Sequence, residues 1–102
     1  MAVEVSDNAD EERYEATTGG TVAGYAAYRL RPGLIAFVHT EVDEAFEGQG
    51  VGSALVSEAL DDARRRALQV LPFCPFVNSY IDKHREYVDL VPEAQRQPFG
   101  LG

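Results

Sequence analysis

The feature that most constrains this chain is a strand-like run that passes through a glycine-rich turn into a long amphipathic helix. The first part of residues 34–42 is apolar on both faces, as expected of a central strand. Residues 50–68 form the clearest helix, because their apolar side chains recur at helical spacing and make one face. The pattern therefore predicts a central strand joined by a short turn to a helix.

The turn carries glycine at three alternate positions, Gly48, Gly50 and Gly52. Glycines remove side chains from a backbone that is about to become a helix N-terminus, where unpaired N–H groups favour an anion. The turn therefore predicts a phosphate or pyrophosphate site, and so a nucleotide-type cofactor. A Rossmann site would need another glycine spacing in an alternating α/β chain, and a P-loop would need a Gly-Lys-Ser/Thr sequence that is missing.

The rest of the chain predicts the fold class, a mixed α/β (α+β) domain. A strand, a helix and a further strand in succession imply a right-handed crossover, so the strand after the helix should pair in parallel with residues 34–42. The sheet is therefore an antiparallel meander followed by a β-α-β unit and a C-terminal helix. The other predicted elements are strands at 3–6, 12–17, 21–30 and 69–73, a helix at about 76–87, and a loose tail at 93–102.

Length and charge narrow the protein class. The 102 residues suffice for one domain with one core, here 1–102 with the core at about 12–92. A net charge of −8 argues against non-specific nucleic-acid binding, and no apolar run reaches the ~20 residues of a membrane span. A single cysteine and the lack of a secretory signal predict a reducing, cytoplasmic setting. No histidine, cysteine or carboxylate residues have the spacing of metal ligands, so the sequence predicts no metal site.

Four short segments, in two regions of the chain, together resemble a known family. The segments His39–Val42 and Phe46–Leu55 resemble motif A of the GNAT acetyltransferase superfamily. The later segments Pro72–Val77 and Tyr87–Pro92, with Tyr80 between them, resemble its short, single-domain branch. The resemblance covers roughly residues 12–92. It implies an N-acetyltransferase that uses acetyl-CoA, with a small-molecule or protein amine as acceptor.

The resemblance also implies where acetyl-CoA binds. Its pantetheine arm would pair with the end of the strand near Glu41 and Val42, and the thioester would lie where the strands before and after the long helix splay apart. Asn78 is a further candidate for the pantetheine arm, although asparagines near helix starts also simply cap backbone. The pyrophosphate would lie on the backbone N–H groups of Gly48, Gln49, Gly50, Val51, Gly52 and Ser53.

Two departures from the family pattern affect this reading. Family members usually carry Arg or Gln where this chain has Glu47, and a carboxylate there would repel a pyrophosphate. The chain also lacks the N-terminal helices that roof the acceptor side in longer members. The acceptor site is therefore expected to be shallow, or to be completed by a partner.

Three residues are candidates for catalysis. Cys74 lies where a strand gives way to a helix, and it could accept the acetyl group, protonate departing coenzyme A thiolate, or be a small buried hydrophobe. His39 could remove the amine proton or be structural, and a relation between His39 and Cys74 is conceivable. Tyr80 could act as a general acid or be a buried aromatic. By strand alternation, Glu41 should share a face with His39.

Other functions remain open from the sequence. A non-catalytic module that binds coenzyme A or acetyl-CoA, or a protein-interaction module, is the main alternative. A plain adaptor, in which the glycines only make a tight turn, is a third. The acidic group Glu41, Asp43, Glu44 and Glu47 is either solvated loop or an attractor for a cationic substrate. The sequence favours neither nucleic acid nor membrane as a partner and leaves the oligomeric state open.

Overall fold

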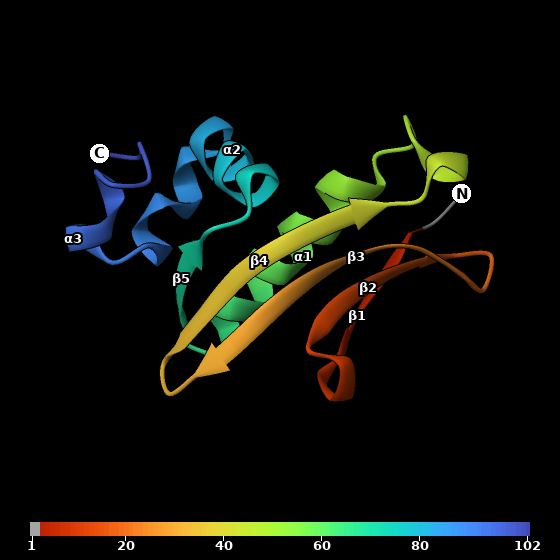
Figure 1. The fold of residues 1–102 in the computed structure, drawn as a ribbon, viewed down its shortest axis with the longest axis horizontal. Coiled ribbons are helices and arrows are strands. Elements are labelled where there is room, and N and C mark those ends of the chain that lie inside the picture. Colours follow the sequence, from red (N-terminus) through yellow and green to blue (C-terminus); the bar gives the residue numbers. More distant parts are fainter. Residues whose placement is uncertain (1–2) are drawn as a thin grey trace.

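A five-stranded mixed sheet is the centre of the fold in the computed structural model, which describes residues 3–102. The strands lie in the order of the sequence, and the first four are antiparallel neighbours (Figure 1). The fifth strand pairs in parallel with the fourth, as the β-α-β pattern predicts. The strands are β1 (Glu4–Asn8), β2 (Arg13–Thr18), β3 (Thr21–Arg31), β4 (Leu34–Val42) and β5 (Gln69–Pro72).

The long helix α1 (Val51–Arg65) lies across one face of this sheet (Figure 1). Its apolar stripe, which includes the fully buried Leu55 and Leu60, packs on the inward side chains of the strands and makes the core. The predicted fold class is thereby confirmed. The remaining elements are α2 (Pro75–Lys83), α3 (Glu93–Arg96) and 3₁₀ helices at Ala9–Glu11, Glu44–Phe46 and Arg85–Leu90. No helix in residues 3–102 has the length and apolarity that crossing a membrane requires.

Both predicted helices end earlier in the structure than the sequence pattern suggests. The helix predicted to reach residue 68 ends at Arg65, because Ala67 takes a left-handed φ of 55° and Leu68 N–H bonds back to the carbonyl of Ala63. The helix predicted to reach residue 87 ends at Lys83. The chain then becomes a 3₁₀ helix, which Arg64 of α1 holds through the Asp89 carboxylate.

The C-terminal segment 93–102 is packed, which corrects the expectation of a loose tail. It contains α3, and Leu101 is only 1% exposed. The Asn78 amide donates to the carbonyl of Phe99, and the Arg85 guanidinium donates to the carbonyl of Leu101. These side chain-to-backbone bonds dock the tail on α2 and on the 3₁₀ helix that follows it, and sequence periodicity does not reveal them.

A partly buried polar cluster ties the first strands to the C-terminal end of α1. The Tyr14 hydroxyl donates to Asp62 at 2.5 Å, and the Tyr28 hydroxyl donates to Asp7 at 2.6 Å. Arg66 lies within 4 Å of both carboxylates, at 3.4 Å from Asp62 and 3.6 Å from Asp7. Burial, followed by the hydrogen bonds to carboxylates, raises the pKa of both tyrosines above the ordinary value of 10.0.

This cluster predicts alkaline destabilisation of the fold. Because the pKa of Tyr14 and Tyr28 is raised in the folded state, their contribution is complete below the unfolded pKa and is lost as pH rises beyond it. We expect the free energy of unfolding to fall above about pH 10. Urea titrations at stepped pH should show a flatter decline for Tyr14→Phe with Tyr28→Phe. Tyr80→Phe, outside the cluster, is the control; an unchanged slope in the double variant would contradict the assignment.

Candidate functional site

The glycine turn forms an uncapped helix N-terminus in front of a cavity. Gly48 and Gly50 take left-handed φ angles of 80° and 76°, and Gly50 is the N-cap of α1. No side chain of residues 3–102 caps this end, so the first N–H groups of α1 are free for a ligand. A cavity of about 250 Å³ lies here, lined by Val42, Phe46, Glu47, Gly48, Gly50, Val51, Gly52, Ser53 and Phe76.

Gly52 has a different role from the other two glycines. A Cβ at this position would lie 2.7 Å from Cζ of Phe76, so the missing side chain lets the aromatic ring rest on the first turn of α1. Phe76 remains 44% exposed and forms one wall of the cavity. Sequence reasoning missed Phe76. The signal that could have revealed it was the third glycine. Gly52 lies inside α1, where no left-handed conformation requires a glycine.

The strands β4 and β5 separate beside this cavity. Their paired register ends at Phe37 opposite Pro72, and the last bond runs from the Cys74 N–H to the Phe37 carbonyl at 2.9 Å. Beyond Phe37, β4 continues to Val42 without a β5 partner among the described residues. We call this divergence the fork. It leaves one edge of β4 open over its last residues.

The alternation of hydrogen bonds identifies which backbone groups face the open edge. The Asp43 N–H bonds to the Ala23 carbonyl, so its neighbour Val42 directs its N–H and carbonyl away from β3. Thr40 has the same orientation by alternation, whereas the backbone of Glu41 points to β3. Of the two residues predicted to pair with a pantetheine arm, Val42 therefore offers its backbone to the fork and Glu41 does not. Thr40 was missed.

A bulge in β4 decides where its side chains point. The register shifts between Ala27 and Tyr28 of β3, which leaves Val38 as the extra residue of β4. After the bulge, Thr40 pairs with the buried Ala26 on the helix-covered face. His39 points to the opposite, exposed face of the sheet, which we call the open face.

His39 and Glu41 share that open face, as strand alternation predicts. The Tyr25 ring lies 5.9 Å from the His39 ring between centroids. The Tyr25 hydroxyl donates to the Glu41 carboxylate at 2.9 Å, and this bond raises the pKa of Tyr25. The open face therefore brings a histidine, a tyrosine and a carboxylate together.

The candidates Cys74 and His39 lie on opposite sides of β4. Cys74 is the N-cap of α2, is 3% exposed, and has its Sγ 3.3 Å from Oγ1 of Thr40. Because Thr40 and His39 are consecutive on the strand, their side chains point to opposite faces. No hydrogen bond joins Cys74 to His39 in residues 3–102. The thiol thus faces the interior of the fork, while the imidazole faces the open side of the sheet.

Tyr80 and Asn78 lie on α2, away from the lining of the glycine-turn cavity. The Tyr80 ring stacks on His84 with 4.1 Å between centroids. Asn78 uses its amide nitrogen on the Phe99 carbonyl and lines a separate groove of about 400 Å³ beside the tail.

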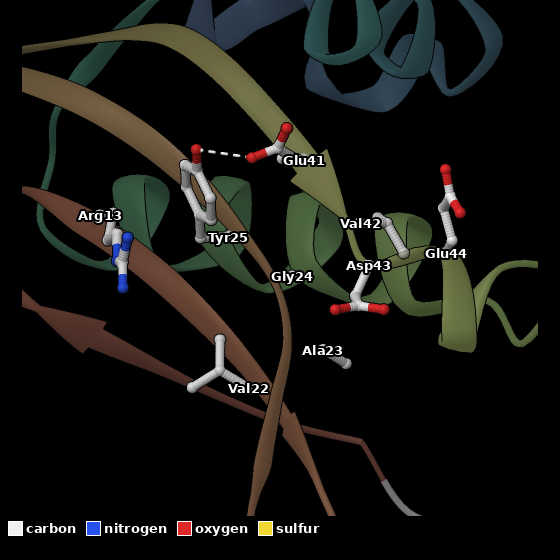
Figure 2. A pocket seen from close by; sticks show the side chains of 9 residues that line it. All are labelled: Arg13, Val22, Ala23, Gly24, Tyr25, Glu41, Val42, Asp43 and Glu44. Atoms are coloured by element: carbon white, nitrogen blue, oxygen red, sulfur yellow. Dashed lines mark hydrogen bonds between the residues drawn. The ribbon is translucent and has the colours of Figure 1, made fainter.

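A third hollow, of about 570 Å³, lies on the open face of the sheet, and we call it the acidic groove. Figure 2 shows Tyr25 and Glu41 reaching towards each other on this face, with α1 behind the sheet. Val42 lines both this groove and the glycine-turn cavity, so the two hollows flank the end of β4. The lining residues are Arg13, Val22, Ala23, Gly24, Tyr25, Glu41, Val42, Asp43 and Glu44.

The surroundings of Arg13 complete the description of this groove. Its guanidinium lies over the Tyr25 ring, 4.7 Å from the centroid, and its Nε donates to Glu15 at 2.7 Å. Residues 3–102 contain no cluster of three or more side chains able to hold a metal ion. The two hollows therefore offer main-chain amides on one side of Val42, and carboxylates with an aromatic ring on the other.

Comparisons with known proteins agree with this geometry. A solution NMR structure of a protein from Staphylococcus aureus, described as GCN5-like, superimposes with a TM-score of 0.67 and 24% sequence identity over 87% of each chain. The search of curated proteins returned no match. The family model described as GCN5-related N-acetyl-transferase matches residues 13–90, which is most of the chain. The chain therefore belongs to the GCN5-related N-acetyltransferase family and is an acyltransferase enzyme of the GNAT superfamily.

Proposed function

We propose that this protein transfers an acetyl group from acetyl-CoA to an amine, with residues 1–102 acting as one acetyl-CoA-binding domain. The observation that carries the proposal is the uncapped N-terminus of α1, which opens into a cavity beside the fork between β4 and β5. Free helix amides suit a pyrophosphate, and an unpaired strand edge suits the amide groups of a pantetheine arm. Family membership supports the same donor.

The proposed contacts follow from the orientation of each group. The Val42 backbone, joined by that of Thr40, would bond the pantetheine arm. Glu41 would contact the cofactor only through its side chain on the open face. Asn78, the further candidate for the pantetheine arm, lies on α2 with its amide nitrogen on the Phe99 carbonyl. Glu47 lines the cavity, and its carboxylate would weaken binding of an anion without abolishing it, because the amides do not depend on that side chain. The pyrophosphate would lie on the amides of Gly48, Gln49, Gly50, Val51, Gly52 and Ser53.

In the proposed reaction the amine nitrogen attacks the thioester carbonyl carbon at the fork. His39 takes the proton from the amine, and a strand N–H stabilises the oxyanion. The carbon–sulfur bond then breaks, the acetyl group stays on nitrogen, and the coenzyme A thiolate takes a proton from Cys74 or Tyr80. The position of His39 on the open face supports its role as the base for an acceptor that arrives there.

Cys74 has a second possible role in the same reaction. Its thiolate could attack the thioester first, forming an acetyl-cysteine that the amine then cleaves. Intact mass after incubation with acetyl-CoA distinguishes the two routes. A gain of about 42 Da that is lost in Cys74→Ala would indicate the covalent route, and binding without a gain would indicate direct transfer.

A non-catalytic module that binds coenzyme A is the second candidate. Two features favour it: the Glu47 carboxylate in the cavity, which repels an anion, and the shallow groove on the open face, where an acceptor would bind. Calorimetry with acetyl-CoA, followed by a thiol-release assay across a panel of amines, separates the functions. The transferase predicts both binding and amine-dependent thiol release. Binding without release by any amine would leave the module, and no binding would overturn both.

The contact between Gly52 and Phe76 predicts a selective effect on the donor. In Gly52→Ala the added Cβ should push the Phe76 ring into the cavity and weaken acetyl-CoA binding about tenfold. The free energy of unfolding should not fall, because alanine favours the helix by up to about 1 kcal/mol. Adding Phe76→Leu removes Cζ and should restore binding in calorimetry. A loss of binding that this second change leaves unrepaired would contradict the steric account.

A further inference from the structure

Thr40 reaches the fork with two different parts of the residue. Its backbone N–H and carbonyl face the open edge of β4, whereas its Oγ1 lies 3.3 Å from Sγ of Cys74 on the helix-covered side of the sheet. Only the backbone of Thr40 has a role in the proposed reaction. Its hydroxyl is therefore a polar group beside a candidate catalytic residue that the reaction does not yet use.

Two features of the fold bring this hydroxyl to the sulfur. The Cys74 N–H donates to the Phe37 carbonyl at 2.9 Å, which holds the start of α2 against β4. The bulge at Val38 then turns Thr40, rather than His39, towards the same side of the strand. The contact is thus built by the main chain on both sides and does not depend on the rotamer of a long side chain.

The surroundings of the sulfur make this hydroxyl its polar partner. Cys74 is 3% exposed and belongs to the hydrophobic core. Although it is the N-cap of α2, its side chain makes no capping bond, and Pro75 at the start of the helix has no N–H to offer. The thiol donates instead to Thr40. A thiolate formed here would be removed from water, with the Thr40 hydroxyl in reach of it.

A threonine hydroxyl can serve the sulfur in both protonation states. It carries two acceptor lone pairs and one donor hydrogen, which turns as the hydroxyl rotates. The neutral thiol donates to Oγ1, and once its proton has left, the O–H can turn and donate to the thiolate. A hydrogen bond to an ionised group is stronger than one between neutral partners, so this exchange favours the thiolate. Cys74 passes through that state both as an acid and as a nucleophile.

We propose that Thr40 is a positioning residue for Cys74, whose hydroxyl accepts from the thiol and donates to the thiolate formed during turnover. This inference rests on the proposed acetyl transfer and holds for either role of Cys74. One proton moves, because the sulfur–hydrogen bond breaks and the electron pair stays on sulfur. The proton passes to the departing coenzyme A thiolate when Cys74 is the acid, or to solvent when it is the nucleophile. A proton from solvent restores the thiol after turnover.

The ionisation of the thiol can be followed in the free protein, because the chain contains a single cysteine. Ultraviolet thiolate absorbance is titrated with pH, and the same titration of Cys74→Ala is subtracted to remove the tyrosine signal. The midpoint should lie at least about one pH unit higher in Thr40→Val, which lacks the hydroxyl but keeps the branched shape. It should return towards the wild-type midpoint in Thr40→Ser.

Thr18→Val is the matched control for removing a hydroxyl. Thr18 is 4% exposed at the end of β2, and its Oγ1 has no hydrogen-bond partner in residues 3–102. Its substitution should therefore change neither the thiolate midpoint nor kcat.

A double-mutant cycle tests the same contact in turnover. With an amine from the panel that supports thiol release, Thr40→Val should lower kcat about tenfold and leave KM for acetyl-CoA unchanged, because the backbone of residue 40 keeps its place. Thr40→Ser should retain most of kcat. In a Cys74→Ala background, Thr40→Val should have no further effect, because the group that it positions is gone.

Three results would overturn the inference. They are an unchanged thiolate midpoint in Thr40→Val, equal effects of Thr40→Val and Thr18→Val, and a full loss of kcat from Thr40→Val in the absence of Cys74. The titration needs no acetyl-CoA, so its outcome is separate from that of the transfer reaction. If acetyl-CoA fails to bind in calorimetry, the proposed function itself fails.

Discussion

Replacing His39 with alanine is expected to lower kcat for acetyl transfer about a hundredfold and to leave the affinity for acetyl-CoA unchanged. A positioned general base contributes about 10²- to 10⁴-fold to a rate. The imidazole is exposed on the open face, so its removal leaves no cavity in the core. Steady-state thiol release measures kcat, and calorimetry measures acetyl-CoA binding.

Chemical rescue separates a base from a structural histidine. Added imidazole should restore part of the rate of His39→Ala by entering the vacated space, and it should not accelerate the wild-type enzyme. If His39→Ala keeps kcat within about threefold of wild type, water or another group takes the proton and the assignment of His39 is wrong.

Gly24→Ala is expected to reduce the free energy of unfolding by about 2 to 3 kcal/mol. An added Cβ would lie 2.7 Å from the Glu41 carbonyl oxygen and 3.3 Å from the Val42 Cα. Both contacts are with backbone, so β3 and β4 would have to move apart, whereas at Gly52 the obstacle is only the end of a side chain. Urea unfolding followed by circular dichroism measures the loss.

Gly20→Ala is the matched control for this effect. Gly20 lies in the turn before β3 at a φ of 79°, and an added Cβ meets no atom within 4 Å. Its substitution therefore carries backbone strain without a clash, at about 1 kcal/mol. Equal losses in the two variants would show that the close approach of β3 and β4 at Gly24 is not tight.

The fold was predictable because local sequence patterns identify its main elements. The period-2 and period-3.6 patterns and the turn glycines identify four antiparallel strands and α1, and the handedness of crossovers then places β5 beside β4. The ends of α1 and α2 were not predictable in this way. Ala67 closes α1 in a left-handed conformation although it is not a glycine, and Arg64 binds Asp89 in the 3₁₀ helix that replaces the end of the second predicted helix; periodicity contains neither feature.

The candidate site was predictable in part for the same reason. The turn residues and Val42 follow from a motif, and the structure places them around one cavity. The bulge at Val38 could not be read from the sequence, and it decides that Thr40 rather than His39 meets Cys74. The packing of Phe76 on Gly52 and the acidic groove both depend on contacts between distant segments. Such contacts appear only once the chain is folded.

The most direct test of the central claim is an NMR titration of the ¹⁵N-labelled protein with coenzyme A. The account predicts saturable shifts that are largest for the amides of Gly48–Ser53, with further shifts at Thr40 and Val42 on the open edge of β4. Amides of β1 and β2 should move little, because those strands lie on the far side of β3 from the fork. Saturable shifts confined to other surfaces, or no shifts at millimolar coenzyme A, would contradict it.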